Sequence, residues 1–120
     1  MTGRPAALLA ATLLLGGCAS GAKPTLVPGG DAGRGKQLIA RYGCGGCHVI
    51  PGIRGAQGDV GPSLRHFRRV RFIAGRIPNS PENAMRWIRD PQGIEPGTIM
   101  PDLGVKPDEA RDIVAYLYAH

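Results

Sequence analysis

The stretch RYGCGGCHVIPG, residues 41–52, contains two of the chain's three cysteines and one of its three histidines. A Cys-x-x-Cys-His run is compatible with a redox dithiol, half of a zinc site, a plain disulfide or a covalent haem attachment site. These four interpretations need different surroundings. The compartment of the chain and the residues around the run therefore decide between them.

The first 17 residues have the layout of a secretory signal peptide. One positive charge, Arg4, precedes an apolar run at residues 6–15, and small residues follow it. As a helix this run would extend about 15 Å, half of the ~30 Å hydrocarbon core of a bilayer, so it is too short for a stable membrane span. We therefore expect residues 1–17 to be removed on export.

A second signal lies at the end of this segment, in LLGGC at residues 14–18. The pattern resembles the lipobox of bacterial lipoproteins, in which the cysteine is acylated and becomes the first residue of the mature chain. The resemblance implies lipidation of Cys18, attachment of the protein to a membrane and a location in the bacterial periplasm. An ordinary signal peptide with an incidental cysteine is the alternative.

Residues 18–30 comprise Cys18 and a Gly- and Pro-rich stretch without periodicity. This composition predicts a flexible tether with a root-mean-square reach of ~20 Å. The folded domain is then residues 31–120, in a compartment where thiols face oxidising conditions. The chain has six aromatic residues against thirty Gly and Pro. A small domain with so little bulk usually needs a disulfide, a metal or a cofactor to complete its core.

Three segments have the apolar spacing of short amphipathic helices. The first follows Asp31, which is placed to cap it, and ends before Gly43. The second follows Ser80 as N-cap, with Pro81 at its first turn, and the third begins at Pro107 near the end of the chain.

No segment shows convincing strand alternation, and the stretches 49–64 and 91–105 are punctuated by Gly and Pro. The fold class is therefore all-α, with two long loops. Loops of this length in a compact domain are uncommon unless they serve a site.

Among the four interpretations of the Cys-x-x-Cys-His run, haem attachment explains the most. A redox dithiol needs a βαβ framework, and a structural zinc needs four ligands. A disulfide accounts for neither His48 nor the poor core. Thioethers from Cys44 and Cys47 to a porphyrin would place the imidazole of His48 over the iron, and the haem would supply the missing apolar bulk.

A haem iron held in this way has a second axial position, for which there are four candidates. Met85 lies within the second helix, where a methionine usually fills the core. His66 lies in an arginine-rich stretch, and His120 is the last residue. Met100 lies in EPGTIMPDLG, a loop that can bring a thioether close to a ring, and is the favoured ligand.

With these residues in view, the sequence resembles a class I cytochrome c, the monohaem family with His/Met ligation. The resemblance covers residues 31–120 and runs in order through CGGCH, GPSL, WIRDP, PGTIMP and DIVAYLY. It implies the all-α cytochrome c fold, with three to four short helices and loops wrapped around one covalently attached haem c.

The resemblance also implies roles for individual residues. Cys44 and Cys47 would be the thioether anchors, His48 the proximal ligand and Met100 the distal ligand. The carbonyl of Pro62 would accept the N–H of the proximal imidazole, which fixes its orientation and basicity.

Other family positions are matched less specifically. Trp87 and Ile88 resemble the apolar pair on the methionine side of the haem pocket, with simple packing as the alternative for the tryptophan. Gly35 and Tyr116 match the place where the first and last helices cross. The arginine that binds the haem propionates is not defined, because Arg69, Arg71 and Arg76 compete for that role.

The sequence is basic, with a formal net charge of +6, and RHFRRVR at residues 65–71 holds four arginines in seven residues. A positive rim of this kind would steer docking onto the acidic surface of a redox partner, although solvated arginines are the plainer interpretation. The expected compartment excludes nucleic acid as a partner.

The predicted function is a membrane-anchored c-type cytochrome that carries single electrons in a respiratory chain and is not an enzyme. Its electrons would come from a quinol or a cytochrome donor and go to a terminal oxidase. Two alternatives stay open. One is a haem enzyme or gas-binding sensor with a labile sixth ligand, resembling a small peroxidase, and the other is a fixed electron-relay subunit of a larger redox complex.

Overall fold

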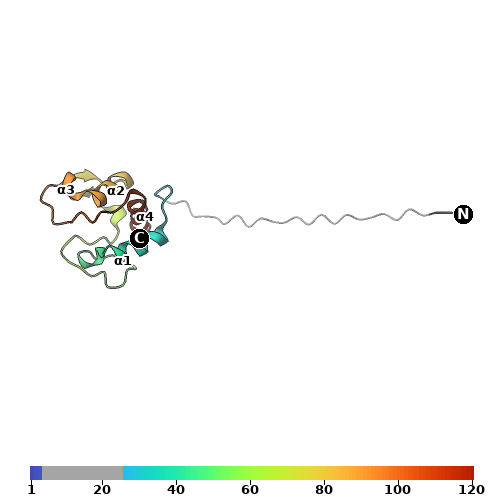
Figure 1. Ribbon diagram of the computed structural model, residues 1–120, viewed down its shortest axis with the longest axis horizontal. Coiled ribbons are helices and arrows are strands. Elements are labelled where there is room, and N and C mark those ends of the chain that lie inside the picture. Colours follow the sequence, from blue (N-terminus) through green and yellow to red (C-terminus); the bar gives the residue numbers. More distant parts are fainter. Residues whose placement is uncertain (4–25) are drawn as a thin grey trace.

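The computed structural model describes residues 1–3 and 26–120 (Figure 1). Cys18 and most of the expected signal peptide and tether lie outside the described residues. Within the described part, no helix has both the length and the apolar character needed to cross a membrane.

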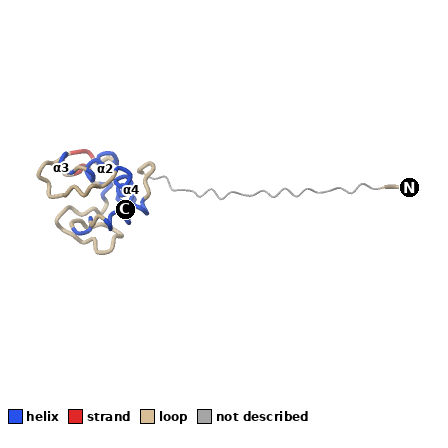
Figure 2. The backbone as a smooth tube through the Cα atoms, viewed as in Figure 1, coloured by secondary structure: helices blue, strands red, loops and turns tan. Residues whose placement is uncertain are grey.

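The architecture is all-α, as the sequence predicts, and loops make up much of it (Figure 2). Short 3-10 turns precede and follow the long loop that comes after the first helix, and a two-stranded antiparallel hairpin lies before the second helix. In chain order the elements are α1 (Ala32–Arg41), η1 (Cys44–Gly46), η2 (Phe67–Arg69), β1 (Phe72–Ile73), β2 (Ile77–Pro78), α2 (Pro81–Arg89), α3 (Pro91–Ile94) and α4 (Pro107–Ala119).

Two of these features differ from the sequence prediction. The hairpin β1–β2 was not expected, since its strands have only two residues each and show no alternation to detect. Helix α3 occupies the start of the predicted loop 91–105, where Asp90 caps a single turn by accepting from the backbone N–H of Gly93 at 2.8 Å.

The expected helix starts are confirmed. The Asp31 side chain accepts from the backbone N–H of Arg34 at 2.9 Å at the start of α1. The Ser80 hydroxyl accepts from the backbone N–H of Asn83 at 3.2 Å at the start of α2. Each of these bonds satisfies a donor that would otherwise have no partner within the helix.

Helix α4 is the centre of the fold and packs against both α1 and α2 (Figure 1). Helices α1 and α4 approach each other closely at Gly35, where a Cβ atom would lie 2.0 Å from the carbonyl oxygen of Asp112. Only glycine allows this approach. Tyr116, the other residue expected at the crossing, is buried in the core and donates its hydroxyl to the carbonyl of Pro51 at 2.6 Å, which ties α4 to the loop that follows η1.

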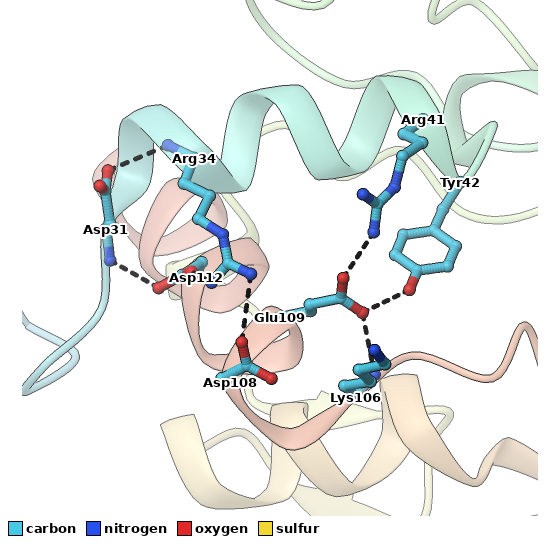
Figure 3. Close-up of polar contacts among 8 residues, drawn as sticks. All are labelled: Asp31, Arg34, Arg41, Tyr42, Lys106, Asp108, Glu109 and Asp112. Atoms are coloured by element: carbon cyan, nitrogen blue, oxygen red, sulfur yellow. Dashed lines mark hydrogen bonds and ion pairs between the residues drawn. The ribbon is translucent and has the colours of Figure 1, made fainter.

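Two buried carboxylates of α4, Asp112 and Glu109, form hydrogen bonds to residues of α1 and its ends where the two helices cross (Figure 3). Asp112 accepts from the backbone N–H of Asp31 at 2.8 Å and from the guanidinium of Arg34. At the other end of the crossing, Glu109 is held by a separate set of donors, which are the hydroxyl of Tyr42, the backbone N–H of Lys106 at 3.1 Å and the guanidinium of Arg41.

These bonds change the acidity of Glu109. The Tyr42 hydroxyl contributes most, followed by the Lys106 backbone N–H and the Arg41 guanidinium, and together they lower the pKa of Glu109 to about 2. Donors that favour the ionised form depress the pKa of a carboxyl in this way. The crossing therefore carries a stabilising anion at neutral pH.

The packed part of the chain begins before Asp31. Val27 is only 1% exposed and belongs to the main hydrophobic cluster. Its carbonyl accepts from the N–H of Gly30 at 3.0 Å, and a Cβ at Gly30 would lie 2.7 Å from the Cβ of Ala115. Part of the segment expected to be tether thus packs on α4.

Candidate functional site

The Cys-x-x-Cys-His run forms a tight turn directly after α1. Gly43 has φ +71°, in the left-handed region that glycine adopts readily, and reverses the chain there. The carbonyl of Cys44 then accepts from the N–H groups of Cys47 at 3.2 Å and His48 at 3.0 Å. Both cysteines are half-buried, and burial raises the pKa of the Cys44 thiol above its ordinary value.

The imidazole of His48 is held in one orientation. Its Nδ1 lies 2.7 Å from the carbonyl oxygen of Pro62, and since a carbonyl only accepts, Nδ1 carries the hydrogen. The lone pair of Nε2 is then available for a metal. Gly61 packs against the ring so closely that a Cβ there would lie 2.4 Å from Cε1 of His48.

His48 and Met100 line the same cavity. Cys44 contributes to the wall next to His48. The remaining lining residues are aliphatic and come from α1, α2, α4 and the loops, namely Ile39, Ile50, Leu64, Ile88, Leu103, Val105, Ile113 and Leu117.

Of the four candidates for the second axial position, all within the described residues, only Met100 lines this cavity. Met85 packs half-buried against the core. His66 and His120 line a separate hollow beside η2 and the end of α4. Met100 as the second axial ligand stays a prediction, and its position in this cavity is consistent with it.

The other expected site residues have mixed positions. Ile88 lines the cavity, whereas Pro62 reaches it through its hydrogen bond to His48. Trp87 is half-buried against the core, and neither it nor Cys47 is among the described residues that line the cavity. The role expected for Trp87 in the haem pocket stays a prediction.

The structure also bears on the three arginines that compete for the propionates. Arg76 forms a two-pronged ion pair with Glu95, with one contact at 2.9 Å, and this pair lowers the pKa of Glu95. Arg76 is therefore already paired with a carboxylate of the protein. Arg69 and Arg71 are exposed, and neither forms an ion pair within the described part of the chain.

Several residues of the site were not singled out from the sequence. The loop residues Ile50, Leu64, Leu103 and Val105 complete the cavity wall, but they lie in stretches with no periodicity to reveal a buried face. Gln92 contacts the Met100 loop through its side chain, and a glutamine in a Pro-Gln-Gly turn carries no signal of such a role.

The residues present fit a haem. An imidazole nitrogen and a thioether sulfur are the donors that hold haem iron in low-spin electron-transfer proteins. Here they share an aliphatic cavity, and a Cys-x-x-Cys-His turn forms one edge of it. An all-α fold with such a site defines a haem-binding protein of the c type.

Comparison with known proteins leads to the same class. The Cytochrome c family matches residues 32–119 of the chain. The chain is similar to cytochrome c oxidase subunit 2 of Alkalihalophilus pseudofirmus, with 37% identity over 89 residues, or 72% of this chain and 25% of that protein. It is similar to the proteins of the same name from Bacillus sp. (strain PS3), at 35% over 66 residues (53% and 18%), and Bacillus subtilis, at 28% over 89 residues (72% and 25%).

The chain belongs to the cytochrome c family. It spans a quarter or less of the length of the curated relatives that it matches. Family membership implies a covalently bound haem c, and the CXXCH motif at Cys44, Cys47 and His48 is consistent with it. The family indicates electron transfer as the activity.

Proposed function

We propose that this chain is a membrane-anchored cytochrome c that carries single electrons in a respiratory chain and delivers them to a terminal oxidase. The observation that carries the proposal is the shared cavity, which brings His48 and Met100 together inside an aliphatic wall. Two axial ligands from the protein leave the iron no open position for a substrate.

Cys44 and Cys47 would hold one haem c through thioethers, with Nε2 of His48 and the sulfur of Met100 as axial ligands. The haem supplies one-electron exchange between ferric and ferrous iron. The hydrogen bond from His48 to Pro62 keeps the imidazole in place and raises its basicity. The aliphatic wall excludes water, and a rigid pocket limits the rearrangement that accompanies each change of charge.

The anchor in this proposal is a lipid on Cys18. Val27, the first core residue, lies nine residues beyond that cysteine. A fully extended chain of this length spans at most about 30 Å, so the cytochrome domain would stay close to the membrane surface. Two or more acyl chains hold a protein firmly to a bilayer. We place the domain in the bacterial periplasm.

The proposed electron acceptor is supported by the relatives, which are named as subunits of cytochrome c oxidase. The docking surface would be the arginine-rich segment 65–71, whose four arginines are exposed and form no ion pair within the described residues. Asn79 fixes this segment by donating to the carbonyls of Phe67 and Val70 and accepting from the hydroxyl of Tyr118. A positive surface of fixed shape suits an acidic partner.

The same comparison favours a second candidate, a fixed electron-relay subunit of a larger redox complex. In the relatives, the matching segment belongs to a protein named as an oxidase subunit. Sedimentation of the full haem-loaded chain in mild detergent separates the two functions. A monomer that reduces an added oxidase supports the mobile carrier, whereas co-purification in a stable stoichiometric complex supports the relay subunit.

Visible spectroscopy of the haem-loaded full chain tests the proposal. We expect low-spin spectra that carbon monoxide does not alter, and a ferric sulfur-to-iron band that is lost in Met100→Ala. Met85→Ala is the matched control, since Met85 lies outside the cavity, and it should keep the band. Ready binding of carbon monoxide by the unmodified ferrous protein would overturn the carrier and favour a haem enzyme or gas sensor.

A further inference from the structure

The loop that carries Met100 has few attachments to the rest of the protein. Between Glu95 and Gly104, its backbone hydrogen bonds are local, such as the N–H of Thr98 to the carbonyl of Glu95 at 3.0 Å. Among the described residues, its side-chain links to other parts of the fold are the ion pair between Glu95 and Arg76 and the amide of Gln92. Ile99, beside the proposed ligand, is 77% exposed.

One side chain compensates for this sparse attachment. The amide of Gln92 donates to the carbonyls of Thr98 at 2.7 Å and Met100 at 3.3 Å, and its oxygen accepts from the N–H of Gly97 at 3.1 Å. A single residue thus bridges both ends of the turn that leads into Met100. Gly97 has φ +83°, in the left-handed region that glycine adopts readily.

Gln92 is itself held on a fixed base. It is the second residue of α3, where the preceding Pro91 is fully buried in the core and Asp90 caps the turn. The hydrogen bonds of Gln92 therefore transmit the position of α3 to the loop. Without them, the polar contacts given for residues 97–100 are local, such as the N–H of Met100 to the hydroxyl of Thr98 at 3.4 Å and the N–H of Thr98 to the carbonyl of Glu95 at 3.0 Å.

We propose that Gln92 is a positioning residue for the sixth iron ligand. By donating to the carbonyls of Thr98 and Met100, it restricts the loop to conformations in which the Met100 side chain faces the cavity. The inference rests on the proposed His48/Met100 ligation and specifies what maintains it. A neutral thioether is a weak ligand, so the sixth coordination bond depends on how much freedom the loop has.

Competition with imidazole tests this role in the ferric, haem-loaded full chain. Imidazole binds only when Met100 has left the iron, so its apparent affinity reports the opening of the loop. We expect Gln92→Ala to raise that affinity about tenfold, which corresponds to ~1.4 kcal/mol. The sulfur-to-iron band should also weaken or become temperature-dependent.

Two further variants separate positioning from general destabilisation. Gln92→Glu keeps the acceptor for the N–H of Gly97 but loses the donor, and it should open the loop at least as much as Gln92→Ala. Asn83→Ala removes a comparable amide bond, from Asn83 to the carbonyl of Pro78 at 2.9 Å, away from the loop. It should leave imidazole affinity unchanged even where it lowers the melting temperature.

The proposal is overturned if either Gln92 variant binds imidazole as the unmodified protein does, or if Asn83→Ala raises the affinity equally. Met100→Ala distinguishes a failure of the Gln92 proposal from a failure of the proposed His48/Met100 ligation. A band and an imidazole affinity that survive Met100→Ala would show that another residue is the ligand, whatever Gln92 does.

Discussion

The two loops that present the proposed axial ligands are built differently. The loop after η1, which follows His48, is joined to itself by backbone bonds that cross long stretches of chain, such as Gly61 N–H to the Cys47 carbonyl at 2.8 Å and Leu64 N–H to the Val49 carbonyl at 2.9 Å. The loop of Met100 is held by side chains, chiefly Gln92. Backbone bonds survive most substitutions, whereas a side-chain attachment is lost with one.

This difference indicates which of the two proposed axial ligands is the harder to displace from the iron. On the His48 side, the carbonyl of Pro62 fixes the imidazole, and Tyr116 ties the loop to α4 through Pro51. On the Met100 side, the loop has freedom that a single substitution can increase. We therefore expect His48 to stay bound under conditions in which Met100 is displaced, and the following variants test each side.

The largest effect, on the unfolding free energy and on haem attachment, is expected from Gly61→Ala on the His48 side of the site. The added Cβ would lie 2.4 Å from the imidazole of His48 while the backbone stays fixed by Cys47, so the ring must turn away from Pro62. Overpacking of this kind costs about 1–3 kcal/mol of unfolding free energy. Denaturant unfolding and the yield of covalently attached haem measure the two consequences.

Gly46→Ala is the control for this variant, since nothing lies within 4 Å of its added Cβ. It should change stability by less than about 1 kcal/mol. Equal effects of the two substitutions would contradict the contact between Gly61 and His48 as the cause.

The His48 side is also the part of the site that the sequence predicts better. The Cys-x-x-Cys-His run, the cap at Asp31 and the turn at Gly43 are local signals, and local chemistry forms them in the same way in the structure. The contacts of Gln92 depend on how α3 is placed, and a helix of four residues has no period to detect. Burial of Val27 likewise depends on the hydrophobic cluster formed by residues far along the chain, which the surrounding Gly and Pro do not reveal.

The second expected effect is a dependence of the unfolding free energy on pH, and it arises at the α1–α4 crossing. The turn that contains His48 follows directly after α1. The pKa of Glu109 is lowered to about 2, so the unfolded chain binds its proton at a higher pH than the folded protein does. The stabilisation is complete above the ordinary carboxyl pKa of about 4.3 and is lost as the pH falls from there toward 2. Unfolding midpoints measured across this range should fall steeply.

Glu109→Gln should flatten that fall and lower the midpoint at neutral pH, because the amide cannot replace an anion that faces Tyr42 and Arg41. Asp59→Asn, an exposed carboxylate with no ion pair among the described residues, is the control. An identical pH profile in the two variants would show that acid acts elsewhere. Imidazole affinity should stay constant in both until the protein unfolds, since the crossing does not hold the Met100 loop.

The smallest effect is expected from the ion pair between Arg76 and Glu95, the other attachment of the Met100 loop. The Arg76 side chain is 62% exposed, and exposed pairs contribute little because water and salt screen them. Arg76→Met and Glu95→Gln should each raise imidazole affinity by less than about threefold at low ionic strength, and the increase should vanish near 0.5 M salt. The double variant should match the single ones, since either substitution already breaks the pair.

The increase in imidazole affinity caused by Gln92→Ala should instead persist in high salt, because the hydrogen bonds of Gln92 join neutral groups. An increase at Arg76 that equals that at Gln92 and resists salt would mean that the loop is fastened to the hairpin rather than to α3.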